Sequence, residues 1–380
     1  MKIFKRSLSV FLLLLLVISC STTTMESQVD QLKAISKKHI ADTRLEVFDI
    51  EKNGNIIEVR TSNANVFQEI SALNNNHIKL TLLPEKSLET QYGVINLSAA
   101  NIRSERRHGS ELLTQGILGQ PVKIFDQKGD WYKIQTPDKY LGWVDDYGVH
   151  PMTEKEMKSW NKADKIIFLE HAGFVYAEEN SDGEIVSDIV LGNMLKLTGK
   201  THRFYQVEFP DGRTGYVKKS EATTEQEWLD NIEVTGENLA AIAKKFMGVP
   251  YLWGGTSAKA LDCSGFMKTV YFMHGIILQR DASQQALWGE EVSMAEDYAH
   301  LQIGDLIFFG SNPERITHVG LYLGDKEFIH EAGRVKINSL DPDAANYSGY
   351  RASSVRGVRR IIESVDKPGI SSYKTHEFYK

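Results

Sequence analysis

The residues of this sequence that could do chemistry are one cysteine and two histidines that follow it. The chain has two cysteines, and Cys263 is the one that lies outside the N-terminal segment. His318 and His330 come later, each within strand-like sequence. A single cysteine followed by histidines is the sequence pattern of a thiol hydrolase, in which a histidine accepts the proton of the attacking thiol.

Local periodicity predicts the elements that position these residues. Apolar residues recur three or four apart after Cys263, which indicates an amphipathic helix that begins at or near the cysteine. Because the unpaired N–H groups of a helix start favour a thiolate and can bind an oxyanion, we expect a lowered thiol pKa. Residues 317–323 read as a strand, and a turn at 324–326 predicts a hairpin that places His318 nearly opposite His330. Such a pair can serve as a general base and its orienting partner.

Other interpretations of the same residues stay open. A buried cysteine is commonly a small hydrophobic residue, and a strand histidine is commonly just hydrogen-bonded. One cysteine and two histidines could also bind Zn²⁺ with an open position, but the chain lacks an HExxH motif and a paired-cysteine motif. We therefore expect no metal and no other cofactor.

Several ordered segments resemble the NlpC/P60 family of cysteine peptidases over residues 235–362. The matching segments are residues 250–255, 261–266, 279–285 and 301–309, together with both histidine segments. The resemblance implies a papain-like α+β domain in which the helix of the nucleophile packs on an antiparallel sheet.

The resemblance also implies a role for individual residues. Cys263 corresponds to the nucleophile, His318 to the general base and His330 to its orienting partner. The residues that would bind the oxyanion or the substrate beside them are Tyr251, Trp253 and Ser264.

The region before this domain contains an internal repeat. Residues 117–124, 131–134 and 141–144 match later segments at a constant offset of 73 residues, which is strong evidence of duplication. Short alternating runs broken by Gly and Asp predict a small antiparallel β-barrel in each copy. The copies resemble bacterial SH3 domains, and we place them at residues 86–150 and 160–223.

Two SH3-like domains ahead of the peptidase domain resemble the γ-D-glutamyl-L-diamino acid endopeptidases of that family. The resemblance implies that peptidoglycan stem peptides with a free N-terminal L-alanine are cut after D-glutamate. Glu111, Tyr140 and Asp281 match the positions that accept the ammonium group, and a buried ammonium needs such partners. Ala282 stands where some relatives have a hydroxyl. A non-catalytic peptidoglycan-binding lipoprotein and an amidase of the same fold remain as alternatives.

The N-terminal segment indicates export. Residues 1–20 combine basic residues with a short apolar stretch and end at Cys20, which follows a small residue as in a bacterial lipobox. We expect a lipoprotein signal peptide, lipid on Cys20 and a location in the cell envelope; an ordinary signal peptide or an uncleaved anchor is the alternative.

The remaining segments complete a multidomain chain. Its 380 residues exceed one small core, and a formal net charge of −6 gives no basic face for nucleic acid. Residues 26–85 predict a small α+β unit of unassigned role, and residues 363–380 read as a polar tail that we expect to be loose. The chain is expected to be a monomer.

Overall fold

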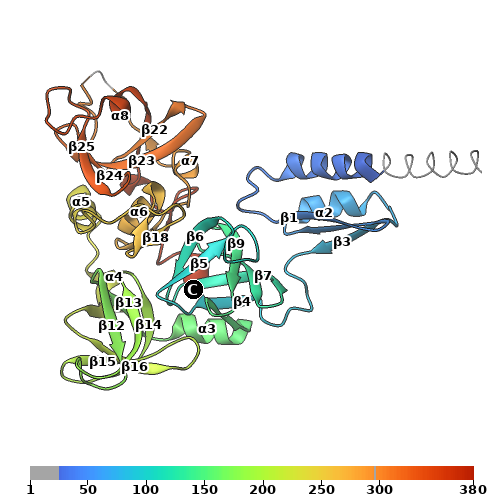
Figure 1. Ribbon diagram of the computed structural model, residues 1–380, viewed down its shortest axis with the longest axis horizontal. Helices are drawn as coiled ribbons and strands as arrows, with labels where there is room; N and C mark the ends of the chain where they lie inside the picture. The colour runs from blue at the N-terminus through green and yellow to red at the C-terminus, as the bar shows by residue number, and fades with distance from the viewer. Residues whose placement is uncertain (1–24, 295–296) are drawn as a thin grey trace, which may run out of the picture. The chain divides into compact units, whose positions relative to one another are not determined.

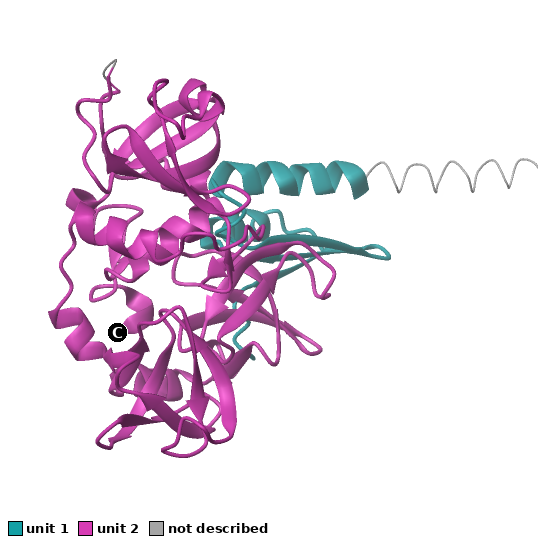
Figure 2. Cartoon of the chain, turned by 60° about the vertical axis from the view of Figure 1, so that its left-hand side comes forward, with its two compact units in different colours: residues 1–88 teal, residues 89–380 magenta. Residues whose placement is uncertain are grey.

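The computed structural model describes residues 25–294 and 297–380, so the expected signal peptide and Cys20 lie outside it. The chain divides into two compact units, residues 1–88 and 89–380 (Figure 2). In the smaller unit, residues 25–39 are helical. Strands β1 (Phe48–Asn53) and β2 (Ile56–Thr61) form a hairpin, and α2 (Ala64–Ser71) leads to β3 (Ile78–Leu82), which runs parallel to β2. No described helix is long and apolar enough to cross a membrane.

The internal repeat is visible as two sheets with the same strand order. The first sheet has the order β10-β4-β7-β8-β9-β5-β6, and the second, read from its other end, has β17-β11-β14-β15-β16-β12-β13. The strands of the first sheet are β4 (Tyr92–Ile95), β5 (Ala99–Arg103), β6 (Leu112–Ile117), β7 (Pro121–Lys128), β8 (Trp131–Gln135), β9 (Leu141–Asp145) and β10 (Val149–Met152). The second copy has β11 (Lys165–Phe168), β12 (Ala172–Tyr176), β13 (Ile185–Val190), β14 (Met194–Lys200), β15 (Phe204–Glu208), β16 (Thr214–Lys218) and β17 (Ala222–Thr224). Corresponding strands begin 73 residues apart, so the duplicated sequence has duplicated topology.

The closed barrels that we expected are not confirmed. In each copy the pairing of the described strands is that of an open sheet, with β10 and β6 at the edges of the first and β17 and β13 at the edges of the second. Alternation of apolar and polar residues predicts which face of a strand is buried, but closure depends on strand tilt and stagger, which it does not encode.

Short helices follow each sheet. Helices α3 (Glu154–Lys162) and α4 (Glu225–Asp230) both begin with a capping box, in which a threonine side chain and the glutamate three residues later satisfy each other's backbone N–H groups.

The C-terminal half packs helices against an antiparallel sheet (Figure 1). The sheet has the order β21-β26-β22-β23-β24-β25. Its strands are β21 (Glu290–Glu291), β22 (Leu306–Asn312), β23 (Arg315–Gly324), β24 (Glu327–Glu331), β25 (Val335–Ser339) and β26 (Val355–Arg360). The helices are α5 (Gly236–Lys244), α6 (Cys263–Phe272), α7 (Ala282–Gln285) and α8 (Gly349–Ser353), and the short pair β18 (Thr256–Ser257) and β19 (Ala260–Leu261) precedes α6.

Helix α6 is fixed by the core between it and the sheet. Phe266 and Val270 on the helix are fully buried in one cluster with Val319 and Leu321 of β23 and Ile329 of β24. Full burial of each such side chain contributes about 1.5–3 kcal/mol. The start of α6, where Cys263 lies, is therefore held firmly against β23.

The expectation of a loose C-terminal tail is wrong. Strand β27 (Ser371–Ser372) pairs with β20 (Ile276–Ile277), and Tyr373 and Phe378 are buried. The hydroxyl of Tyr373 donates to Glu225, which ties the tail to the start of helix α4. No periodic pattern predicts this packing, because the buried aromatic residues stand singly among polar ones.

Candidate active site

Cys263 is the first residue of helix α6, as the sequence predicted. Asp262 caps the helix, since its Oδ1 accepts the backbone N–H of Gly265 at 2.8 Å. A Cβ atom on Gly265 would lie 2.0 Å from the carbonyl oxygen of Gly255, so only glycine fits this first turn. The thiol is buried, with 8% of the residue exposed.

A buried ion pair supports this helix start. The guanidinium of Arg280, only 1% exposed, binds both carboxylate oxygens of Asp262. Arg280 also donates to Ser264 Oγ at 3.1 Å, and the Ser264 hydroxyl in turn donates to Asp262. The Ser264 hydroxyl is thus engaged inside the protein, and what this residue offers a substrate is its backbone.

The electrostatics of the thiol differ from the expected lowered pKa. Burial, and then the Asp262 carboxylate, raise the pKa of Cys263 to about 12, although hydrogen bonds from the backbone N–H groups of Val319 and Ser264 act in the other direction. The expectation of a thiolate in the free protein is therefore wrong, because desolvation outweighs the helix start.

The two histidines are held as neutral bases. Burial, followed by the charge of Arg351, lowers the pKa of His318 well below its ordinary value. Burial also lowers the pKa of His330 to about 4, against an opposing hydrogen bond with Asn338. At neutral pH the site therefore contains a neutral thiol and two neutral imidazoles.

A chain of hydrogen bonds assigns the position of each imidazole proton. Asn338 Nδ2 donates to the carbonyl oxygen of Asn346 at 2.8 Å, so its Oδ1 faces His330 Nε2 at 2.9 Å as an acceptor. His330 Nε2 must then carry the proton, and its Nδ1 accepts from His318 Nε2 at 2.7 Å. The lone pair of His318 is therefore left on Nδ1, which can accept a proton.

The hairpin expectation holds with a shift in register. Strands β23 and β24 pair Leu321 with Ile329 and Tyr322 with Phe328, so the residue opposite His330 is Gly320. A Cβ atom on Gly320 would lie 3.1 Å from the His330 Cβ, and glycine leaves the room through which the two rings meet. His318 and His330 are diagonal neighbours, brought into contact by ring size and strand twist.

The predicted amine-binding residues meet across the junction with the first SH3-like copy. The hydroxyl of Tyr140 donates to Asp281 Oδ2 at 2.9 Å, and Trp253 Nε1 donates to Glu111 Oε1 at 2.9 Å. Trp253 is 63% exposed, which suits the wall of an open pocket. Each bond joins a residue of the SH3-like copy to one of the peptidase half.

Tyr251 lies beside the thiol as an undissociated phenol. Burial, and then the charge of Cys263, raise the pKa of Tyr251 well above its ordinary value. A phenol that keeps its proton is a hydrogen-bond donor, which is the property that an oxyanion requires.

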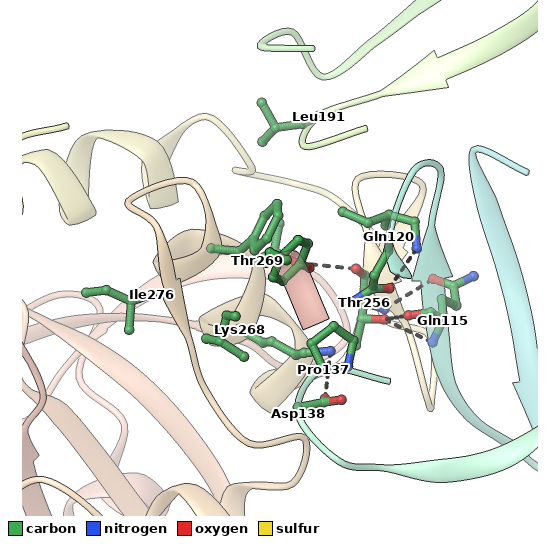
Figure 3. Close-up of a pocket in the computed structure, with 13 residues that line it drawn as sticks. Gln115, Gln120, Pro137, Asp138, Leu191, Thr256, Lys268, Thr269 and Ile276 are labelled. Atoms are coloured by element: carbon green, nitrogen blue, oxygen red, sulfur yellow. Dashed lines mark hydrogen bonds and ion pairs between the residues drawn. The ribbon is translucent and has the colours of Figure 1, made fainter. Parts of the chain in front are cut away.

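Polar contacts lock the two halves of the site together (Figure 3). Thr256 and Gln115 exchange three hydrogen bonds of 2.8–3.1 Å through backbone and side-chain atoms. Beside them the buried pair Lys268–Asp138, at 2.7 Å, spans the same junction and lines a mainly apolar cavity that does not include Cys263. These contacts position the SH3-like copy relative to helix α6.

Residues missed by sequence reasoning complete the site. Arg280 and Asn338 support the nucleophile and the histidines, and Arg351 lies on α8 near them. Glu331 is fully buried with no hydrogen-bond partner for either oxygen among the described residues, and burial raises its pKa to about 7. Two of these residues could have been found from the sequence, because Arg280 adjoins Asp281 and Glu331 adjoins His330, and Asp281 and His330 are predicted site residues. Within the described residues, no group of three or more His, Cys, Asp or Glu side chains is placed to hold a metal ion.

Comparison with known proteins agrees with this geometry. Residues 248–355 match the NlpC/P60 family, and residues 98–149 match the bacterial SH3 domain. A γ-D-glutamyl-L-lysine dipeptidyl-peptidase of Bacillus cereus is 31% identical over 67% of this chain and 77% of its own. Dipeptidyl-peptidase 6 of Lysinibacillus sphaericus is 26% identical over 69% of this chain and 97% of its own. The crystal structure of an NlpC/P60 family protein from B. cereus superposes with a TM-score of 0.62 at 25% identity, covering 71% of this chain and 99% of that one. The chain therefore belongs to the NlpC/P60 family and is a cysteine peptidase with bacterial SH3 architecture ahead of its peptidase domain.

Proposed function

We propose that this peptidase acts on the bacterial cell wall, hydrolysing the bond between γ-D-glutamate and the diamino acid of peptidoglycan stem peptides whose N-terminal L-alanine is free. The observation that carries the proposal is the bond between Tyr140 and Asp281, which sets a phenol and a carboxylate from two domains at one point. Glu111, held by Trp253, adds a second carboxylate at the same junction. The name of the B. cereus relative, a γ-D-glutamyl-L-lysine dipeptidyl-peptidase, supports this choice of substrate.

The proposed first step is attack by a thiol that loses its proton as it reacts. Because the pKa of Cys263 is high and that of His318 is low, no stable thiolate–imidazolium pair forms beforehand. His318 Nδ1 takes the thiol proton while the sulfur bonds to the γ-carbonyl carbon of D-glutamate. The developing oxyanion is bound by backbone N–H groups at the start of α6 and by the phenol of Tyr251.

The second half of the reaction uses the low basicity of His318. An imidazolium with a low pKa is a strong acid, so it donates its proton readily to the nitrogen of the leaving diamino acid. His330 keeps the ring in place through its bond to His318 Nε2, and Asn338 fixes His330. Water then attacks the thioester, with His318 as base, and releases L-Ala-D-Glu and free Cys263.

The amine pocket explains how the enzyme would select released fragments. A free ammonium can pair with Asp281 and Glu111, whereas an acylated amine would leave these carboxylates without a cation once the bound substrate covers them. Sites built on such polar contacts discriminate strongly against substrates that cannot make them. Intact wall, in which the L-alanine nitrogen is acylated, is therefore a poor substrate.

We also propose that the enzyme works outside the cytoplasm, attached to a membrane by lipid on Cys20. The lipobox-like sequence supports this, although Cys20 lies outside the described residues. Metabolic labelling with a fatty acid checks it: label should enter the wild-type chain and not Cys20→Ala.

The specificity is tested with one peptide in two forms. L-Ala-γ-D-Glu-diaminopimelate and its N-acetylated form are supplied to the wild-type enzyme, and kcat/KM is measured from the products by mass spectrometry. We expect the free amine to be preferred at least about 100-fold. Equal rates on both forms, or removal of the N-acetyl group as by an amidase, would count against the proposal.

A further inference from the structure

Arg351 is a half-buried cation for which the described residues supply no carboxylate. Its backbone N–H is bound by Ser348 at the start of α8, but its guanidinium forms no ion pair or hydrogen bond with the described residues. Leaving a guanidinium partly desolvated and unpaired is costly unless a ligand completes it. Arg351 thus differs from Arg280 and Arg360, which are both paired with aspartates.

Two aromatic rings hold this guanidinium in place. Its carbon lies 5.5 Å from the ring centre of Phe309 and 5.3 Å from that of Tyr350. Phe309 is fully buried, whereas Tyr350 is 74% exposed, so the group sits where the core meets solvent. Contacts with ring faces leave the in-plane N–H donors of a guanidinium available, and these donors match a carboxylate in a bidentate manner.

The position of Arg351 is beside the catalytic histidine. The Phe309 ring, which the guanidinium contacts, is also 5.6 Å from the His318 ring. The charge of Arg351 acts on His318, on His330 and on Cys263. Arg280, which also acts on Cys263, is paired with Asp262 and lies within reach of the charges of Asp281 and Tyr140 in the amine pocket.

This places Arg351 with the leaving group. In the proposed reaction the substrate amine is held at Tyr140 and Asp281, and the chain crosses Cys263 to the nitrogen that His318 protonates. That nitrogen belongs to the diamino acid, so a cation beside His318 and outside the amine pocket faces the diamino acid. We infer that Arg351 binds a carboxylate of the leaving diamino acid, an inference that rests on the proposed function.

The carboxylate has two possible sources in the same residue. Every stem tripeptide has an α-carboxylate at its C-terminus. Diaminopimelate has a further carboxylate at the end of its side chain, beside an ammonium, whereas lysine has the ammonium alone, which Arg351 would repel. Lys336, the cross-strand partner of His330, also acts on both histidines, so the positive charge on this side is shared.

Three peptides separate these sources: L-Ala-γ-D-Glu-diaminopimelate, L-Ala-γ-D-Glu-L-Lys, and the latter with a C-terminal amide. We measure kcat/KM for wild type, Arg351→Gln and the control Arg356→Gln, whose guanidinium is occupied by backbone carbonyls of Ser311, Ser353 and Val355. Alkylation of Cys263 by iodoacetamide reports whether the nucleophile is intact in each variant.

We expect Arg351→Gln to lower kcat/KM roughly 10- to 100-fold on peptides that carry the bound carboxylate and less than threefold on those that lack it. A loss confined to diaminopimelate identifies the side-chain carboxylate, and a loss on both acids but not on the amide identifies the α-carboxylate. An equal loss on all three peptides, or no loss, overturns the inference. Failure of the proposed function is seen separately, since the wild type would then cut none of the three after D-glutamate.

Discussion

Asn338→Asp should move the acid limit of activity upward. The hydrogen-bond chain requires neutral His330 with its proton on Nε2. A second proton, on His330 Nδ1, would point at His318 Nε2. His318 would then have to carry its own proton on Nδ1, the nitrogen that acts as the base. In the wild type this fails as pH falls through the His330 pKa, which is about 4. A carboxylate in place of the Asn338 amide stabilises the imidazolium and so raises that pKa.

The size of the shift follows from the geometry. Asn338 Oδ1 lies 2.9 Å from His330 Nε2, which places the charge centres about 4 Å apart. At an effective dielectric constant of about 20 this attraction is about 4 kcal/mol, equivalent to about three pH units. Because Asn338 is only half-buried, solvent reduces the effect, and we expect a shift of about one to three pH units.

The assay is a pH profile of kcat/KM on the free-amine tripeptide between pH 4 and 9. We expect Asn338→Asp to retain much of its activity at pH 8.5 and to lose it at about pH 6, where the wild type is still active. Asn55→Asp, which adds the same charge on the exposed turn of the N-terminal hairpin, should leave the profile unchanged. An unshifted acid limb in Asn338→Asp, or an equal loss at every pH, would refute the hydrogen-bond chain.

Three further predictions concern the thiol, the amine pocket and the domain junction. Because the pKa of Cys263 is raised to about 12, its alkylation by iodoacetamide should be slow at pH 6 and rise steadily beyond pH 9; a constant rate from pH 5 to 8 would mean a preformed ion pair. Tyr140→Phe removes a donor to Asp281, and such a bond to a charged group is worth about 1.5–3 kcal/mol. We therefore expect kcat/KM to fall by about 10-fold or more on the free-amine peptide and not to fall on the N-acetylated peptide. Equal falls on both peptides would argue against an amine site. Burial tends to raise the pKa of the Asp138 carboxyl, and the charge of Lys268 holds it low. Lys268→Met leaves this buried carboxylate without its cation. The free energy of unfolding should drop by about 3–5 kcal/mol, measured by denaturant titration, and a change below about 1 kcal/mol would show that the pair is not needed.

Local patterns predicted much of this molecule. Helix α6 with Cys263 at its start, the His318–His330 hairpin and the duplicated strands were all predicted from periodicity, turns and internal repetition. These signals work because each depends on residues that lie close together in the chain or on a comparison of the sequence with itself. The amine-pocket residues, by contrast, were predicted from a family resemblance, and their role in binding remains a prediction.

The features that escaped prediction depend on contacts between distant segments. Arg280 lies 18 residues from Asp262, and Asn338 reaches His330 only once β25 has paired with β24. The bulge that shifts the register of β23 and β24, and the burial of Tyr373 in the tail, likewise leave no periodic trace. The predicted lowering of the Cys263 pKa was wrong because the sequence indicates a helix start but does not indicate how deeply the fold buries the thiol.

The most direct test of the account is to identify the products from L-Ala-γ-D-Glu-diaminopimelate by mass spectrometry, with wild type and Cys263→Ala side by side. The account predicts L-Ala-D-Glu and free diaminopimelate with the wild type and no products with the variant. Cleavage at another bond, or equal cleavage by Cys263→Ala, would contradict it.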